Sequence, residues 1–156
     1  MKLLHILNPR TFIMPEFQNF VMKALATNPF IPDAQDAMIE LSGQMLNPNI
    51  GLFVTVEGDK PPGATDWYRG LVLVVNSTTP LSPGCMVLTF YNRDAGRESR
   101  NLLMGAIKAF ANAHGHTKIR GMNISGQPDA FAKLFREVGS PTLRGHLFEF
   151  ELSEGA

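Results

Sequence analysis

The spacing of apolar residues changes several times along the chain, and these changes predict a mixture of helices and strands. Apolar positions recur at helical spacing after Pro15, which suits the first turn of a helix, and again after Asp33, which suits an N-cap. A short apolar run at residues 3–7 predicts a strand that precedes both helices. The predicted apolar faces of the two helices comprise Phe17, Phe20, Val21, Ala24 and Leu25, and then Ala34, Ala37, Met38, Leu41 and Met45.

The rest of the chain continues this mixed pattern. Three strands separated by turns rich in Gly, Pro and Ser are predicted at residues 51–57, 70–75 and 85–91. A long amphipathic helix follows and ends near Gly115, a suitable C-cap, before a fifth strand at residues 119–124. Asp129 begins a further helix, and the chain closes on a strand of alternating apolar and acidic residues at 148–152. The long helix is expected to turn inward Leu103, Ala106, Ile107, Phe110 and Ala113.

Composition and charge restrict the class of protein. The chain has 156 residues, of which 44% are apolar and 18% charged, so it suits a single globular domain. Its 14 basic side chains balance 14 acidic ones, which gives no general attraction to nucleic acid or to an anionic membrane. The single cysteine, Cys85, excludes an internal disulfide and a cysteine-based zinc cluster. Residues 3–7 are too few for a signal peptide, and no apolar run approaches the roughly 20 residues of a membrane span, so we expect a cytoplasmic protein.

The segment 86–116 combines a strand, a polar turn and a long helix. The turn at residues 92–100 directly follows the apolar run of the strand and contains Gly96 and three arginines. At the N-terminus of a helix, free backbone N–H groups and the helix dipole attract an anion. The pattern therefore predicts a site for a phosphate-bearing ligand. The alternative is a solvated charged turn that only begins a helix.

The order of the predicted elements, together with three segments, resembles a known superfamily. These segments are the long helix at 102–115, a short helix that ends in a glycine at 132–139, and a closing strand at 145–152. In this order they resemble the GNAT superfamily of N-acetyltransferases. The resemblance implies an α/β, single-domain GNAT-like fold over residues 1–156. It also implies a mixed, mostly antiparallel central sheet flanked by about four helices.

The resemblance further implies a site for acetyl-CoA. In the superfamily, the pyrophosphate rests on backbone amides of a turn with the pattern Gln/Arg-x-x-Gly-x-Gly/Ala, and the pantetheine arm follows the edge of the preceding strand. Arg93 matches the first position of this pattern and Gly96 the fourth. The expected cofactor-binding residues are Phe90, Tyr91, Asn92, Arg93, Asp94, Ala95, Gly96, Arg97, Glu98 and Ser99.

Two departures from the superfamily pattern bear on this expectation. Glu98 occupies the sixth position of the turn, where the superfamily has Gly or Ala. Its carboxylate would repel a pyrophosphate unless it turns to solvent or pairs with Arg93 or Arg97. Phe135 stands where many members have a tyrosine that protonates the departing thiolate, and phenylalanine has no proton to donate.

Glu57 is the candidate catalytic residue. It ends a predicted central strand, where a carboxylate often acts as a general base, although a surface residue at a strand end is the alternative. Trp67 and Tyr68 either line the mouth of a substrate site or anchor the loop that contains them. His114 and His116 have a spacing that could bind a metal in a strand, but they lie at the predicted end of a helix, where histidine is favourable in itself, so no metal site is expected.

Two functions follow from these observations. The first is an acyl-CoA-dependent N-acyltransferase, in which a primary amine of a small molecule or a protein attacks acetyl-CoA directly in a ternary complex. The second is a non-catalytic GNAT-fold protein that has lost cofactor binding. Small phage-encoded members that serve as virion or protein-interaction components are similar, and such a protein would act in the host cytoplasm or the virion. Acetyl-CoA and an amine acceptor are the expected partners in the first case and a protein in the second, with neither nucleic acid nor membrane involved.

Overall fold

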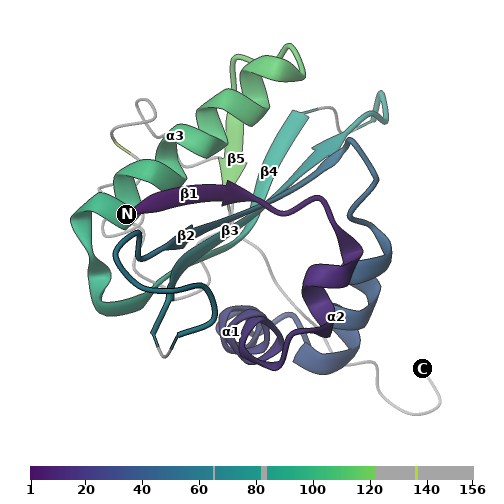
Figure 1. Ribbon diagram of the computed structural model, residues 1–156. Coiled ribbons are helices and arrows are strands. Elements are labelled where there is room, and N and C mark those ends of the chain that lie inside the picture. The colour runs from purple at the N-terminus through teal and green to yellow at the C-terminus, as the bar shows by residue number, and fades with distance from the viewer. Residues whose placement is uncertain (65, 82–83, 122–135, 137–156) are drawn as a thin grey trace, which may run out of the picture.

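The computed structural model describes residues 1–64, 66–81, 84–121 and 136, and these form one five-stranded sheet with helices on both faces (Figure 1). The order of the strands in the sheet is their order in the chain. The first four strands pair in antiparallel fashion, and β5 pairs with β4 in parallel. The predicted mixed, mostly antiparallel α/β fold is therefore confirmed. The strands are β1 (Lys2–His5), β2 (Ile50–Val56), β3 (Tyr68–Ser77), β4 (Gly84–Asn92) and β5 (Ile119–Gly121).

The helices form two layers on opposite faces of the sheet (Figure 1). A short 3-10 helix, η1 (Pro9–Ile13), leads from β1 into α1 (Pro15–Ala26), and α1 and α2 (Ala34–Gly43) pack together on one face. The long helix α3 (Arg97–Ala113) covers the other face. None of the described helices is both long and apolar enough to cross a membrane. The predicted fourth helix and closing strand lie outside the described residues.

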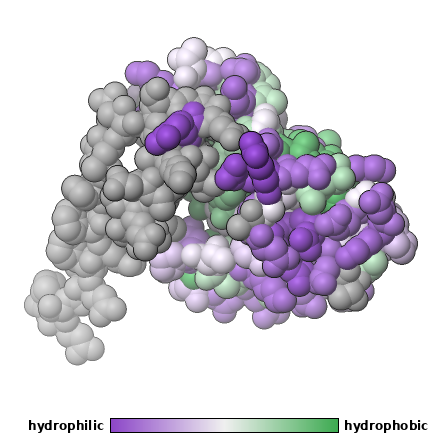
Figure 2. All heavy atoms as spheres, turned by 90° about the vertical axis from the view of Figure 1, so that its left-hand side faces the viewer, coloured by the Kyte–Doolittle hydropathy of each residue, from purple (hydrophilic) through white to green (hydrophobic). Residues whose placement is uncertain are grey.

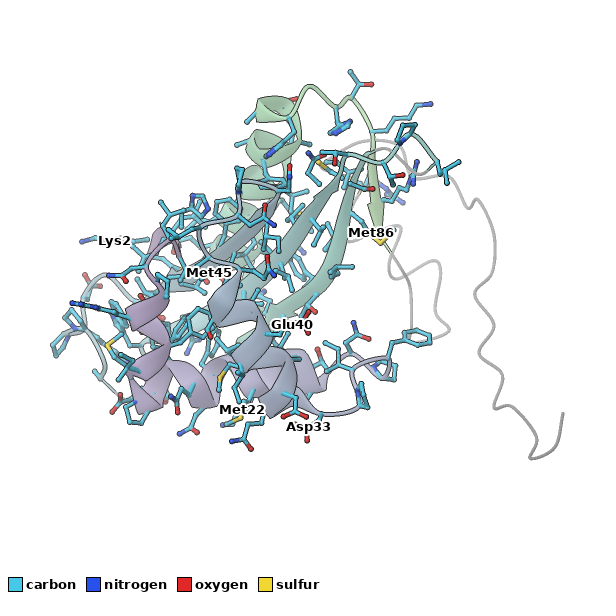
Figure 3. The ribbon with its side chains drawn as sticks, turned by 90° about the vertical axis from the view of Figure 1, so that its right-hand side faces the viewer. Lys2, Met22, Asp33, Glu40, Met45 and Met86 are labelled. Carbon is cyan, nitrogen blue, oxygen red and sulfur yellow. The ribbon has the colours of Figure 1, made fainter. Side chains whose placement is uncertain are left out.

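Most of the predicted helix faces agree with the structure. All five apolar positions predicted for α1 are buried, and α1 begins at Pro15 as expected. The Asp33 carboxylate caps α2, where it accepts hydrogen bonds from the backbone N–H groups of Gln35 and Asp36 at 2.9 and 3.1 Å (Figure 3). The first strand is displaced from its predicted position, because β1 ends at His5 and Leu7 is exposed.

The predicted buried face of α3 is wrong at one residue. Ala113 is exposed, whereas Met104 and Ala111 are buried in addition to the predicted residues. At 100° per residue, these two positions move the centre of the buried face away from Ala113. Gly115 lies just beyond the helix with a φ of +74°, and the next N–H group donates to the Ala111 carbonyl at 2.9 Å, as expected of a glycine that ends a helix.

The N-terminal half of α3 lies unusually close to the sheet at Gly70 in β3. A Cβ atom at Gly70 would lie 2.5 Å from the Ser99 Oγ atom and 2.8 Å from atoms of Leu103 and Thr55. The hydroxyl groups of Ser99 and Thr55 are buried and form a hydrogen bond of 2.6 Å across this contact. Gly70 thus allows the start of α3 to be tied directly to β2.

We expect Gly70→Ala to lower the free energy of unfolding by about 1–3 kcal/mol, because the added methyl group overpacks this contact. A matched control is Gly105→Ala in the interior of α3, where an added Cβ atom meets nothing within 4 Å. This control should raise stability by about 0.5–1 kcal/mol, since alanine favours the helix. Urea denaturation measures both values, and equal effects of the two variants would contradict the close contact at Gly70.

Candidate functional site

The strand β4 contains a bulge just beyond its described pairing with the parallel strand β5. Within the described residues, this pairing joins Cys85 to Val87 of β4 with Ile119 to Gly121, where the described part of β5 ends. In the antiparallel pairing with β3, Leu73 lies opposite Thr89 but Val74 lies opposite Val87, so Leu88 is an extra residue in β4. Such a bulge bends a strand and increases its twist. The bulge therefore bends β4 at Leu88, just beyond its described pairing with β5.

A buried asparagine holds the bulge in place. The Nδ2 group of Asn28, which lies just after α1 and is only 7% exposed, donates a hydrogen bond of 3.2 Å to the Leu88 carbonyl. The hydroxyl of Thr89 is buried and has no hydrogen-bond partner among the described residues. Sequence reasoning missed both residues, because nothing in the local pattern connects Asn28 with a strand that lies 60 positions away.

The turn between β4 and α3 leaves the first N–H groups of the helix open. The chain passes through a one-turn 3-10 helix, η2 (Arg93–Ala95), in which Asp94 has a left-handed φ of +57°. The Asn92 side chain then donates a hydrogen bond of 2.9 Å to the carbonyl of Gly96. Gly96 is the N-cap of α3 and offers no side chain to the first-turn N–H groups, which have no carbonyl partner within an α-helix. This end of the helix is suited to an anion.

The space over Gly96 is open. Its φ of −59° is accessible to any residue, and a Cβ atom built there would approach nothing closer than the Ser99 Cβ atom, at 4.0 Å. The fold itself therefore does not require glycine at this position. A bulky ligand that approaches the backbone would require it.

Carboxylates already neutralise two arginines beside the turn. Arg93 pairs with Asp66, in the loop before β3. Arg69 in β3 bridges two acidic groups: its Nε atom lies 3.3 Å from the Glu57 carboxylate and its terminal nitrogen 3.1 Å from that of Asp94. Arg69 thus connects the candidate base, Glu57, with the candidate cofactor turn. No sequence pattern indicates this bridge, because it depends on the pairing of β2 with β3.

No protein-family model matches the sequence, and no curated protein matches it. Solved structures do. A probable acetyltransferase superposes with a TM-score of 0.67 at 12% identity, over 99% of both chains. The aminoglycoside N-acetyltransferase AAC(6')-Iy, in complex with a bisubstrate analog of coenzyme A, superposes with a TM-score of 0.69 at 12% identity, over 97% of this chain and 98% of its own. A GNAT family acetyltransferase from Staphylococcus aureus has a TM-score of 0.62 at 12% identity, over 97% of this chain and all of its own.

The fold is that of the GNAT acetyltransferases. The bulged end of β4 and the start of α3 are the part of this GNAT fold at which the cofactor residues were predicted. Figure 2 shows the side of the molecule at which α3 begins, and its described surface is mainly hydrophilic with a smaller hydrophobic area.

Two side chains of the turn in this GNAT fold, the carboxylate of Glu98 and the hydroxyl of Ser99, contact other groups of the chain. The Glu98 carboxylate is 69% exposed and lies 3.6 Å from the N-terminal amine, so it pairs with neither Arg93 nor Arg97. Ser99 is buried, and its hydroxyl is occupied by Thr55. Only the backbone of Ser99 remains available to a ligand. The first departure from the superfamily pattern, Glu98, is thus turned toward solvent. The second, Phe135, lies outside the described residues.

The two strand residues before the turn face opposite layers of the GNAT fold. Phe90 packs against the core under α3, whereas Tyr91 packs against the core under α1. The Tyr91 ring lies 5.7 Å from that of Phe20. Tyr91 and Arg93 also line a hollow of about 130 Å³, together with Trp67 and Tyr68. Trp67 and Tyr68, which the sequence assigned either to a substrate site or to a loop anchor, therefore line a hollow beside the candidate cofactor segment.

The remaining sequence candidates have structural partners. The two ring nitrogens of His114 contact the carbonyls of Phe110 and Pro48, and His116 contacts the side chain of Asn76. Cys85 is buried, and burial raises the pKa of its thiol. Among the described residues, no three side chains of the kinds that bind metals come together.

Proposed function

We propose that this protein is an acyl-CoA-dependent N-acyltransferase that transfers an acetyl group from acetyl-CoA to a primary amine. The observation that carries the proposal is the start of α3, a helix end without a side-chain cap that follows the bulged strand β4. Its first N–H groups suit a ligand that carries phosphate. Structural neighbours in complex with coenzyme A, or with an analog of it, support the same reading.

In this proposal, the residues expected from the sequence, 90–99, hold the cofactor chiefly through their backbone. The N–H groups of the first turn of α3 bind the pyrophosphate, because the side chains of Arg93 and Ser99 are engaged elsewhere. The part of β4 from Leu88 to Asn92 lies along the pantetheine arm. Acetyl-CoA supplies an activated thioester to this site.

The protein's own residues then have two tasks, to position the amine and to remove its proton. The lone pair of the amine nitrogen attacks the thioester carbonyl carbon, a C–N bond forms, the C–S bond breaks, and coenzyme A leaves as the thiolate. We assign the proton lost by the nitrogen to the Glu57 carboxylate, through water molecules, because Arg69 ties this carboxylate to Asp94 at the turn end of β4. Arg69, whose Nε atom lies 3.3 Å from this carboxylate, positions it.

A thermal-shift titration with acetyl-CoA tests the proposal, with coenzyme A and ATP as controls. A ligand at about 100 times its dissociation constant adds about 2.7 kcal/mol of stability, which raises the melting temperature by several degrees in a protein of this size. We expect a saturable shift with acetyl-CoA and coenzyme A and none with ATP. The absence of a shift at millimolar acetyl-CoA would contradict the function.

One observation favours the second function, a non-catalytic GNAT-fold protein that binds another protein. The arginines that would attract phosphate, Arg69 and Arg93, are paired with carboxylates of the chain itself. If this neutralisation abolishes cofactor binding, the titration above will show no shift. It therefore separates the two functions in one measurement.

A further inference from the structure

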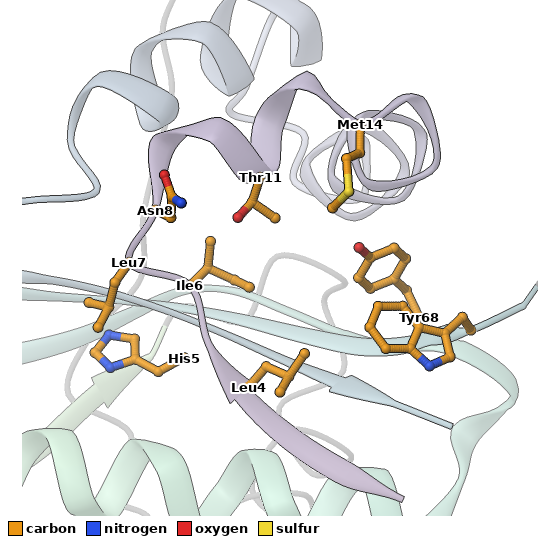
Figure 4. A pocket seen from close by; sticks show the side chains of 9 residues that line it. Leu4, His5, Ile6, Leu7, Asn8, Thr11, Met14 and Tyr68 are labelled. Carbon is orange, nitrogen blue, oxygen red and sulfur yellow. The ribbon is translucent and has the colours of Figure 1, made fainter. Parts of the chain in front are cut away.

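A second and larger hollow lies where β1 leaves the sheet and enters η1 (Figure 4). It measures about 310 Å³, which is in the lower range of small-molecule sites. Residues from three parts of the chain line it: the end of β1 with the segment that follows, the start of α1, and the start of β3. These residues are Leu4, His5, Ile6, Leu7, Asn8, Thr11, Met14, Trp67 and Tyr68.

The described lining of this hollow is mainly apolar. Aliphatic and aromatic side chains supply most of it, and none of the described residues that line it is an acid, a lysine or an arginine. Partial burial lowers the pKa of His5, which favours its neutral imidazole. The side-chain oxygen of Asn8 already accepts a hydrogen bond of 3.0 Å from the backbone of Arg10. A ligand with several charges would find no partner here, and burying unpaired charges is costly.

Large apolar side chains stand exposed around the opening. Leu7 is 54% exposed, Met14 is 44% exposed, and the adjacent Ile13 is 71% exposed. Apolar side chains gathered around a hollow mark a binding surface more often than isolated ones do. An apolar body seated in the hollow would cover part of Leu7 and Met14.

An aromatic wall joins this hollow to the candidate cofactor segment. Trp67 and Tyr68 line both hollows, and their rings lie 4.9 Å apart. The smaller hollow continues from them to Tyr91 and Arg93, and its lining also includes the acids Glu16 and Asp66 and the base Lys23. Burial and, to a lesser extent, the charge of Glu16 raise the pKa of Tyr68, so this carboxylate acts on the shared wall.

We propose that the larger hollow binds the amine acceptor, and that the acceptor is a primary amine on a small, uncharged apolar or aromatic body. This inference rests on the acyltransferase function proposed above. The body of the acceptor occupies the space between η1 and the wall of Trp67 and Tyr68. Its amine extends past Tyr68 into the smaller hollow, where Glu16 offers a negative charge beside Lys23 and the Arg93–Asp66 pair, and Tyr91 leads along β4 toward Leu88. Acceptors with several ammonium groups, such as aminoglycosides and polyamines, do not match this lining.

The test compares acceptors at saturating acetyl-CoA, with the free thiol of released coenzyme A as the readout. We expect 2-phenylethylamine, tryptamine and hexylamine to be acetylated with a kcat/KM at least about tenfold above those of spermidine and neamine. Thr11→Trp fills the larger hollow and should raise the KM for 2-phenylethylamine at least about tenfold. The matched control is Thr117→Trp, the same change at an exposed residue that lines neither hollow.

A second variant keeps the inference testable if Thr11→Trp does not fold. Leu7→Asp places a carboxylate at the exposed edge of the hollow, and it should shift the preference from 2-phenylethylamine toward spermidine. A thermal shift with acetyl-CoA separates the two proposals. If the shift is present but spermidine and neamine are preferred, or if the variants leave the preference unchanged, the acceptor inference is wrong and the function stands. If acetyl-CoA gives no shift, both are overturned.

Discussion

Gly96→Asp is expected to abolish coenzyme A binding while leaving the protein folded. The position has room for a Cβ atom, because its φ is −59° and no atom of the described residues would lie closer than 4.0 Å to it. An aspartate at this N-cap position would take the first-turn N–H groups of α3 itself and repel a phosphate. Charge repulsion at close range in a partly exposed site weakens binding by about 100-fold or more. Isothermal titration calorimetry measures the affinity, and thermal unfolding confirms the fold.

The matched control for this variant is Gly96→Asn. Asparagine has nearly the same size and caps a helix as well as aspartate does, but it carries no charge. Both variants should unfold at the temperature of the original protein or slightly above it. The asparagine variant should lose less affinity than the aspartate variant. Unchanged affinity in both would remove the turn from the cofactor site.

Glu57→Gln should lower kcat by about 100-fold to 10,000-fold, the usual contribution of a general base. Glutamine has the shape of glutamate and can still accept a hydrogen bond from Arg69, but it cannot take a proton at neutral pH. The KM for acetyl-CoA should stay the same, because Glu57 does not belong to the proposed cofactor segment. Steady-state kinetics at saturating acetyl-CoA and amine test this expectation.

Arg69→Gln distinguishes a catalytic carboxylate from a structural ion pair. This change removes the bridge from Arg69 to Glu57 and Asp94 but leaves the Glu57 carboxylate in place. If Glu57 is the base, kcat falls far less in Arg69→Gln than in Glu57→Gln. Equal losses in the two variants would show that Glu57 only holds Arg69, and the assignment of the base would be wrong.

The parts of the fold that local spacing controls were predictable from the sequence. Each buried position of α1 follows from the 3.6-residue period, and Asp33 was recognisable as a cap from its type and place. Ala113 was misplaced because alanine fits either side of a helix, whereas the buried Met104 was not assigned to the inner face. The 3.6-residue period alone therefore predicts the last buried residue at the edge of a helix face only to within about one position.

The candidate site depends on contacts that no local pattern encodes. The bulge at Leu88 adds one apolar residue to an apolar run, so the composition of β4 does not reveal it. The hydrogen bond from Asn28 and the bridge through Arg69 connect residues that are close only after the sheet has formed. The backbone turn around Gly96 was predicted, whereas the partners of its side chains were not.

The close contact at Gly70 affects how a ligand would bind at the start of α3. Because Ser99 is bonded to Thr55 through buried hydroxyls, the first turn of the helix cannot tilt without breaking a contact inside the core. Its N–H groups therefore keep one direction in the free protein. A ligand that binds there loses its own freedom but does not have to order the helix, which is the entropic advantage of a preorganised receptor. Association at this helix end should then proceed as a rigid encounter, without a slow rearrangement of the protein backbone.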